Sequence, residues 1–436
     1  MDVLLYYIVP IGGLALTAVG IGYARWSGNP AVRGERRERR LDKFRAVRAW
    51  MRELGSDRKI IEAAHRGHAD LLAPAPMSLF ITDPAWVLAE PLELDRLTVR
   101  LVDASEVPPV AEAGYEPLLR YWPLAADNRP LARYHEAVSQ FGPPPRLWFD
   151  WPSYRLLGVD RRTDGGFDLR VGTTTYWDGF DSWSALHFEA AYQLRESEVA
   201  RKKRAPGDAG VNGPYRESLG SPFSLADRNC AIGLSVLTVY RTSRGAFFYL
   251  QRRAAAQVAT LGGMAGLLPA GEFQPSSKAY AAIRSDADIW RCVMREFAEE
   301  FFGRADLNER GALPDYERES PFRGLQQARL QGRVRPYVLD IGFDPVSWKA
   351  GIRLVCVFEE DAYREILEGM LHESNEGLVE AASLYRVGKE PLDGMPLDEE
   401  TVREYLKDPT ITEGARLCIG LTWEHREKLG LAAPAR

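Results

Sequence analysis

Three glutamates near residue 300 have a spacing that suits metal chemistry. On a helix, Glu296, Glu299 and Glu300 occupy positions i, i+3 and i+4, so their carboxylates project from one face. Three like charges on one turn repel each other, and a divalent cation relieves that repulsion. Hard cations such as Mg²⁺ prefer carboxylate oxygen. The spacing therefore predicts a divalent-cation site, and the alternative is a solvated acidic helix face.

A loop with two glycines precedes this helix. Gly266 and Gly271 allow the backbone to turn tightly and to approach a phosphate group closely. Arg295 stands directly before the first glutamate of the helix and can pair with Glu272 at the end of the loop. Such a pair would fasten the loop to the start of the helix, so we expect the loop to lie beside the acidic face.

The loop and the helix together resemble the Nudix box, G-x5-E-x7-R-E-U-x-E-E-x-G-U, in which U is aliphatic. Gly266 and Glu272 match its first half, and the run from Arg295 to Glu300 matches the charged positions of its second half. Two features depart from the box. Twenty-two residues separate Glu272 from Arg295 where the family has seven, and Phe301-Phe302-Gly303 carries one residue more than x-G. From about Tyr154 onward the chain also looks like a Nudix-like module of actinobacterial proteins.

The resemblance implies an activity and roles for individual residues. Nudix hydrolases cleave a nucleoside diphosphate linked to another moiety, with Mg²⁺ or Mn²⁺ as cofactor. Glu299 and Glu300 would bind the metal, while Glu296 would bind metal or take a proton from the attacking water. The substrate-binding residues would be Gly266, Gly271 and Arg295. Because many Nudix enzymes carry an additional base in a later loop, Glu376 is a further catalytic candidate; the alternative is an exposed loop carboxylate.

The elements around the motif predict a mixed α+β protein. Apolar, β-branched runs over Cys230–Tyr240 and Ala246–Arg252 predict a hairpin before the glycine loop, and Tyr337–Phe343 and Ile352–Phe358 predict later strands. Further expected elements are a strand over Ala381–Val387 and helices over Asp361–Leu371, Glu399–Leu406 and Glu413–Lys428. This order suits a C-terminal Nudix-type α/β/α sandwich over residues 222–436, with Phe273–Asp288 as an insertion outside the core.

Residues 76–221 form an aromatic-rich extension that we also expect to be α+β. Ser153–Val159 and Gly166–Thr175 predict a hairpin, Trp183–Leu194 an amphipathic helix, and Glu196–Pro214 a mobile loop. The aromatic residues favour a core over a ligand platform. The histidines of this region, His135 and His187, have no neighbour at metal-ligand spacing and are expected to be structural.

The N-terminal segment, residues 1–24, predicts one transmembrane helix. Val3–Ala24 contains no charge and is about the length needed to cross a hydrocarbon core. Arginines follow it directly, so by the positive-inside rule the bulk of the protein is cytoplasmic at the cell membrane. A cleaved signal peptide and a buried core helix are the alternatives. Small residues at i and i+4, such as Ala18 and Gly22, allow two such helices to approach, which is compatible with a homo-oligomer.

Residues 25–75 predict a basic helical linker, interrupted near Gly55 and Gly67. Between Arg25 and Arg52 there are ten basic and three acidic residues, which leaves the remainder of the chain at −12 because the whole carries −5. A basic helix beside a membrane span favours contact with lipid headgroups, and the alternatives are a solvated helix and a dimerising coiled coil. An acidic main body argues against nucleic acid as a partner. The four cysteines form no C-x-x-C and are expected to be buried free thiols.

Three functions stay open at this point. The first is a membrane-anchored Nudix-type hydrolase. The second is a membrane-bound sensor or effector whose degenerate Nudix-like domain binds a nucleotide without turnover. The third is a membrane-anchored scaffold that needs no ligand, since fold alone does not define function.

Overall fold

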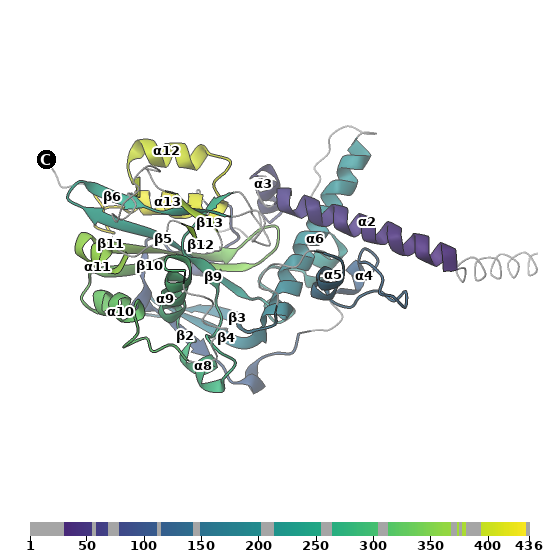
Figure 1. Cartoon of the computed structure of the whole chain (residues 1–436), viewed down its shortest axis with the longest axis horizontal. Coiled ribbons are helices and arrows are strands. Elements are labelled where there is room, and N and C mark those ends of the chain that lie inside the picture. Colours follow the sequence, from purple (N-terminus) through teal and green to yellow (C-terminus); the bar gives the residue numbers. More distant parts are fainter. Residues whose placement is uncertain are drawn as a thin grey trace, which may run out of the picture.

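The computed structural model describes most of the chain after residue 29 (Figure 1). The described ranges are 30–54, 58–68, 78–110, 115–142, 149–201, 213–253, 264–303, 313–367, 373–374, 377–380 and 394–432. The predicted membrane span Val3–Ala24, the candidate base Glu376 and the predicted strand Ala381–Val387 lie outside them. Within these ranges no helix has both the length and the apolar character needed to span a membrane.

A mixed sheet forms the centre of the molecule, and it has seven strands within the described residues. Its order is β1–β10–β11–β5–β6–β14, and β9 also pairs with β5. β11 and β5 run parallel, and the other neighbours in the sheet are antiparallel. The strands are β1 (Leu92–Glu93), β5 (Ile232–Thr242), β6 (Gly245–Phe248), β9 (Ala270–Glu272), β10 (Val334–Phe343), β11 (Ala350–Glu359) and β14 (Met395–Pro396).

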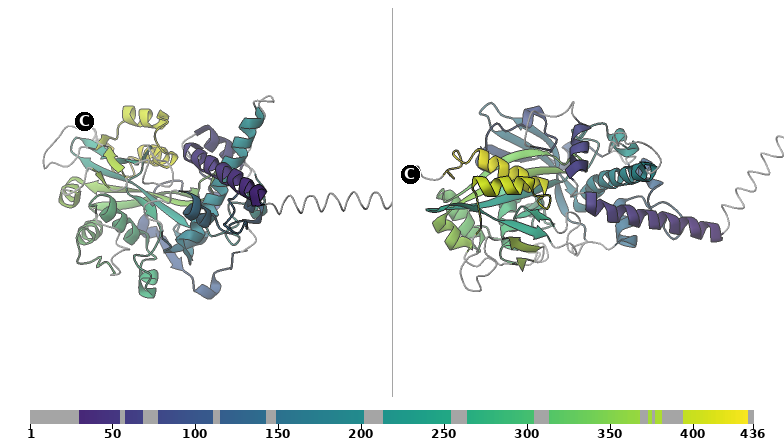
Figure 2. Two further views of the ribbon diagram at one scale, coloured as in Figure 1. Left: turned by 45° about the vertical axis from the view of Figure 1, so that its right-hand side comes forward. Right: turned by 90° about the horizontal axis from the view of Figure 1, so that it is seen from above.

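Both faces of this sheet carry a hydrophobic core because side chains alternate along each strand. In β11, Leu354 and Cys356 belong to one buried cluster, whereas Val355 and Val357 belong to another on the opposite face. Helices α9 (Ile289–Glu300), α10 (Phe322–Leu330) and α11 (Glu360–Leu367) cover the first face. Helices α12 (Glu399–Lys407) and α13 (Glu413–Glu424) cover the second, as the view from above makes clear (Figure 2). The predicted α+β class is confirmed.

Two smaller sheets complete the β structure. β2 (Leu97–Leu101), β4 (Phe167–Thr175) and β3 (Pro152–Arg161) form one, which confirms the predicted hairpin of residues 153–175. The second has the order β12–β13–β7–β8, and its members are β12 (Glu373–Ser374), β13 (Gly377–Glu380), β7 (Leu250–Arg253) and β8 (Ala265–Gly266). Glu373 and Glu380 therefore belong to paired strands, whereas we expected a loop before residue 381.

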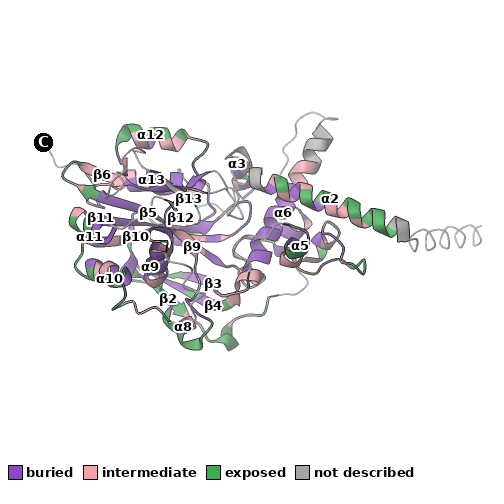
Figure 3. Ribbon diagram, viewed as in Figure 1, coloured by how far each residue is buried: buried purple, intermediate pink, exposed green. Residues whose placement is uncertain are grey.

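The N-terminal helices end where the sequence predicts. α2 (Pro30–Leu54) stops directly before Gly55, and α3 (Arg58–Arg66) stops directly before Gly67. The apolar stripe of α2 packs on α6 (Tyr176–Arg201), where the Phe44 and Phe188 rings lie 5.4 Å apart. Many residues along α2 are exposed, whereas the described part of α6 is mostly buried (Figure 3). A helix of the same chain thus covers the stripe.

Helix α6 differs from its prediction in two ways. The segment from Trp183 to Leu194 is buried on nearly every side, whereas we expected an amphipathic helix. The reason is that α2, α5 (Tyr134–Phe141), α7 (Pro214–Leu219) and the β3–β4 hairpin all pack around it. Residues 196–201, expected in a loop, continue the helix.

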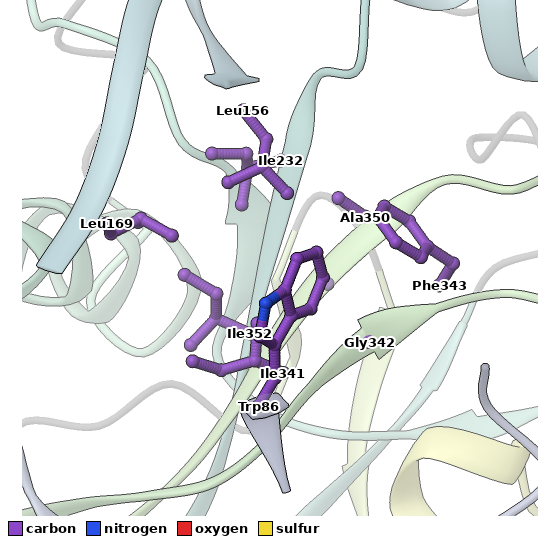
Figure 4. Close-up of a pocket in the computed structure, with 10 residues that line it drawn as sticks. Trp86, Leu156, Leu169, Ile232, Ile341, Gly342, Phe343, Ala350 and Ile352 are labelled. Atoms are coloured by element: carbon purple, nitrogen blue, oxygen red, sulfur yellow. The ribbon is translucent and has the colours of Figure 1, made fainter. Parts of the chain in front are cut away.

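The regions before and after residue 222 share one sheet and one core. β1 pairs with β10 in the register Leu92↔Val338, and Ile81 forms an isolated bridge with Phe343. Where the β2–β4–β3 sheet meets the central sheet, Trp86 and apolar residues of both line a small gap (Figure 4). The gap has no room for a water molecule, so it is a packing contact and not a ligand site.

The predicted placement of Phe273–Asp288 outside the core is wrong at both ends of that segment. Phe273 is fully buried and extends the pairing of β9, since its N–H donates to the Ile232 carbonyl at 2.8 Å. The Phe273 ring also lies 4.5 Å from the ring of Tyr154 on β3. Asp286, near the other end, is also buried. The segment reaches the surface around α8 (Tyr280–Ser285) and again at Asp288.

Candidate functional site

Helix α9 presents its carboxylates because its apolar side is committed to the core. Asp288 caps the helix by accepting a hydrogen bond from the Arg291 N–H at 3.0 Å. Phe297 is buried against the sheet, with its ring 5.7 Å from that of Phe358 on β11. Among the carboxylates of α9, Glu296 and Glu299 are half-buried and Glu300 is buried.

The glycine loop is held by strand β5. The Thr238 hydroxyl donates to the Leu268 carbonyl at 2.7 Å, and the Val236 N–H donates to the Pro269 carbonyl at 2.8 Å. Gly266 lies in β8 opposite Gln251 of β7. Because these contacts involve buried backbone, the loop has one defined course beside α9.

Two of the three glutamates lie on this loop. The Ala270 N–H donates to the Glu300 Oε1 atom at 2.8 Å, which joins the loop to the last turn of α9. The carboxylate of Glu296 lies so close to Gly271 that a Cβ atom on that residue would overlap it. Gly271 is therefore required by a close approach. The structure brings Gly271, Glu296 and Glu300 together, as the spacing of the box predicts.

Glu299 lies next to these two on the helix and is half-buried. The Glu299 charge also acts on Cys292, which lies about two turns earlier on the same helix. Burial raises the pKa of the Cys292 thiol, and the charges of Glu296 and Glu299 add to that rise. The thiol stays protonated and donates to the Glu272 carbonyl at 3.5 Å. All four cysteines are buried and free, as expected.

The predicted pair between Arg295 and Glu272 does not form. Arg295 turns into the core, where its guanidinium lies 3.5 Å from the Asp286 carboxylate and donates to the Tyr316 hydroxyl at 2.8 Å and to the Gln274 carbonyl. Burial alone would lower its pKa, but Cys292, Tyr316 and Asp286 raise it overall. The long insertion supplies Asp286, so the arginine has a partner that the compact box lacks.

Glu272 has a different cation. Its Oε2 atom lies 2.8 Å from the Lys349 ammonium, and its Oε1 atom is buried without a hydrogen-bond partner among the described residues. Lys349 precedes β11 and lies 4.9 Å above the ring of Trp183 on α6. The first glutamate of the box thus faces a lysine from the central sheet, and an orphaned carboxylate oxygen remains beside it.

The donor set suits a hard cation, although the site is not a closed cage. In the described part of the chain, no three His, Cys, Asp or Glu side chains already stand together as metal ligands. Mg²⁺ is usually held by one or two carboxylates together with waters and substrate phosphates. Glu296 on Gly271 and the orphaned Glu272 oxygen are the kind of acceptors that such a cation would satisfy.

Sequence reasoning missed Asp286, Tyr316 and Lys349. Asp286 offered a signal, because it is an acidic residue shortly before a helix that carries an arginine. Tyr316 and Lys349 offered none, since they join the site only through the fold.

His135 and His187, the two histidines considered in the sequence analysis, lie outside this site. His135 Nδ1 lies 2.8 Å from the buried Asp181 carboxylate, and its ring stacks on Trp177. Burial acts to lower the pKa of His135, but the hydrogen bond to Asp181 raises it overall. His187 is buried, and burial lowers its pKa. Both agree with the structural role that we expected.

Comparison of the chain with protein-family models gives no match, and comparison with curated proteins gives none either. The resemblance to Nudix proteins therefore depends on the residues of the box and on the geometry that joins them.

Proposed function

We propose that this protein is a membrane-anchored Nudix-type hydrolase that cleaves a nucleoside diphosphate linked to another moiety. One observation carries the proposal: Glu296 and Glu300 of α9 both lie on the glycine loop that ends in Glu272. Without that contact, three glutamates on a helix would be an acidic surface. A sheet with helices on both faces is the three-layer arrangement that a Nudix-type fold requires, and it supports the proposal.

Each residue has a stated task. Glu300 fixes the end of α9 to the loop through the Ala270 N–H, and Glu296 takes the proton from the attacking water. Glu296, Glu299 and Glu300 are the residues that would hold Mg²⁺ or Mn²⁺, which supplies charge neutralisation of the diphosphate and a more acidic water. The loop from Gly266 to Gly271 shapes the phosphate side. Arg295 is assigned no contact with substrate, because it is buried on Asp286.

The test is turnover by the full chain in detergent. We expect cleavage of at least one member of a panel of nucleoside diphosphate derivatives, dependent on Mg²⁺ or Mn²⁺. Glu296→Gln should lower kcat by about 10²- to 10⁴-fold, the range for loss of a general base. Glu400→Gln makes the same change at an exposed position of α12 on the other face of the sheet, and should leave turnover unchanged. Unimpaired turnover by Glu296→Gln would contradict the assignment.

A second function, nucleotide sensing without turnover, is favoured by a different observation. Glu272 is ion-paired with Lys349, and Glu300 accepts a hydrogen bond from the loop, so both carboxylates have partners before any metal binds. A sensor would show a ligand-induced rise in thermal midpoint with no product, because a ligand that binds only the folded state stabilises it. A scaffold would show neither response.

We also propose that residues Val3–Ala24 anchor the protein as a single-pass helix, with the described body in the cytoplasm. α2 supports this because its apolar stripe packs against α6, while Arg36, Arg39 and Arg45 are exposed. Arg39 also pairs with Glu35, and Arg45 donates to the Phe141 carbonyl at 3.4 Å. Carbonate extraction and protease protection test it. Release into the soluble fraction, or digestion of the body from outside right-side-out vesicles, would contradict it.

A further inference from the structure

Lys349 lies outside every motif of the sequence, yet it is the cation that faces the first glutamate of the box. Its ammonium lies 2.8 Å from the Glu272 Oε2 atom, and the glutamate side chain is only 10% exposed. A charge pair whose carboxylate has so little access to water is screened less than a fully exposed surface pair. The pair therefore constrains where Glu272 can lie.

The lysine is itself held in place by its surroundings. Its backbone carbonyl accepts a hydrogen bond from the Asp344 N–H at 3.0 Å, and Asp344 Oδ1 accepts from the N–H of Ser347 at 2.7 Å. The preceding Trp348 is buried, and its indole N–H donates to the Nε2 atom of His68 at 3.1 Å. The ammonium lies over the Trp183 ring, 4.9 Å from its centroid. A tight turn thus fixes the backbone and an aromatic ring fixes the side chain.

Glu272 is the last residue of β9, the strand that contacts the glutamates of α9. β9 contains only Ala270, Gly271 and Glu272. Ala270 binds Glu300, Gly271 underlies Glu296, and the Glu272 carbonyl accepts from Cys292 of the same helix. A displacement of Glu272 would therefore move the two residues that support the helix carboxylates.

We propose that Lys349 is a positioning residue for the site: through Glu272 it holds β9, and β9 holds Glu296 and Glu300 in their working places. Lys349 takes the part that Arg295 would have played, because Asp286 and Tyr316 keep that arginine in the core. The catalytic consequence depends on the proposed hydrolase function, whereas the structural part, the control of β9, does not.

Hydrogen–deuterium exchange of the full chain tests the structural part without any substrate. In Lys349→Met, the amides of residues 264–274 should exchange about tenfold faster, because opening of this segment becomes easier when its ion pair to Lys349 is lost. Lys349→Arg keeps the charge and should retain most of the protection. Lys428→Met removes an exposed lysine that pairs with Glu90, and should leave residues 264–274 unchanged.

The exchange of α13, on the other face of the sheet, serves as an internal reference. Faster exchange confined to residues 264–274 supports the proposal. Unchanged exchange of that segment in Lys349→Met, or an equal increase in α13, overturns it, because the lysine would then have no effect or only a global one.

Kinetics then test the catalytic part. Lys349→Met should lower kcat with KM nearly unchanged, and Lys349→Arg should recover most of the rate. A rise in KM at constant kcat would overturn the positioning role, since it would show that Lys349 binds substrate directly. If the wild-type chain turns over no substrate, the hydrolase proposal fails, and the exchange result still decides whether Lys349 controls β9.

Discussion

Two cationic side chains, one on the acidic helix α9 and one beside it, differ in burial and in the partners that they bind. The Arg295 side chain is 4% exposed, its partner Asp286 is 1% exposed, and the guanidinium also binds Tyr316 and a backbone carbonyl. The Lys349 side chain is 31% exposed and pairs with a glutamate at the edge of the site. Arg295 is therefore part of the core, whereas Lys349 is part of the site.

This difference shows that a motif position does not by itself define a role. Arg295 stands where the box has its arginine, but the insertion supplies a buried carboxylate that draws it away from the loop. Without the arginine, the Glu272 carboxylate would be largely buried and unpaired, which costs free energy. Lys349, directly before β11, supplies the missing counter-ion. The insertion and Lys349 are thus linked features of this chain.

The largest effect should come from breaking the core pair. We expect Arg295→Met to lower the free energy of unfolding by about 3–5 kcal/mol, because it leaves the Asp286 carboxylate buried without its counter-ion. Denaturant unfolding followed by circular dichroism measures this. Arg323→Met, on the exposed side of α10, should change stability by less than about 0.5 kcal/mol. A loss below about 1 kcal/mol for Arg295→Met would mean that the network contributes little.

Gly271→Ala should separate the site from the fold. Its Cβ would meet the end of a flexible side chain, the Glu296 carboxylate, so the fold should lose little stability while Glu296 is pushed off the loop. We expect turnover to fall roughly a hundredfold, the cost of misplacing a catalytic group by about 1 Å.

Gly414→Ala on α13, on the other face of the sheet, is the matched control for this substitution. Its Cβ would be at ordinary contact distance, 3.9 Å from the Arg353 Nε atom, so turnover should be retained. Full activity of Gly271→Ala would show that Glu296 does not need its place on the loop.

The geometry of this site was only partly accessible to sequence reasoning. Helical spacing placed Glu296 and Glu300 on one face, and the glycines of the loop indicated a close approach. Local patterns therefore indicated the contact of Glu296 with Gly271 and that of Glu300 with the neighbouring Ala270. The hairpin of residues 153–175 and the helix ends before Gly55 and Gly67 also followed from local patterns.

Contacts between distant segments could not be predicted in this way. Lys349 meets Glu272 only because β5 and β11 run side by side, and β1 joins the central sheet only by pairing with β10. α6 is buried on nearly all sides because α2, more than a hundred residues earlier, covers it. The hydrophobic pattern of a single segment does not show which distant segment it will contact.

The smallest effect should be a pH dependence of stability that arises from His68, the partner of the Trp348 side chain next to Lys349. Burial lowers the pKa of His68 to about 4, and Arg216 and His65 add to this, so His68 is neutral when it accepts the Trp348 indole N–H. Below about pH 6.5 the unfolded chain takes up a proton at His68 that the folded chain refuses. Its contribution to stability is therefore present above pH 6.5 and lost progressively down to about pH 4.

His68→Gln keeps an acceptor and cannot titrate. Its thermal midpoint should fall less than that of the wild type between pH 7 and pH 5. Parallel curves for the two proteins would show that His68 titrates normally in the folded chain.

The most direct measurement of the central claim is a calorimetric titration of the full chain with Mn²⁺ in the presence of a non-hydrolysable nucleoside diphosphate analogue. Glu300→Gln removes one charge from the acidic face and keeps an oxygen that can accept from the Ala270 N–H, so it should stay folded. The account predicts that the wild type binds the metal and that Glu300→Gln binds it about tenfold more weakly or worse. Absence of Mn²⁺ binding to the folded wild-type protein would contradict the metal site and the hydrolase function together.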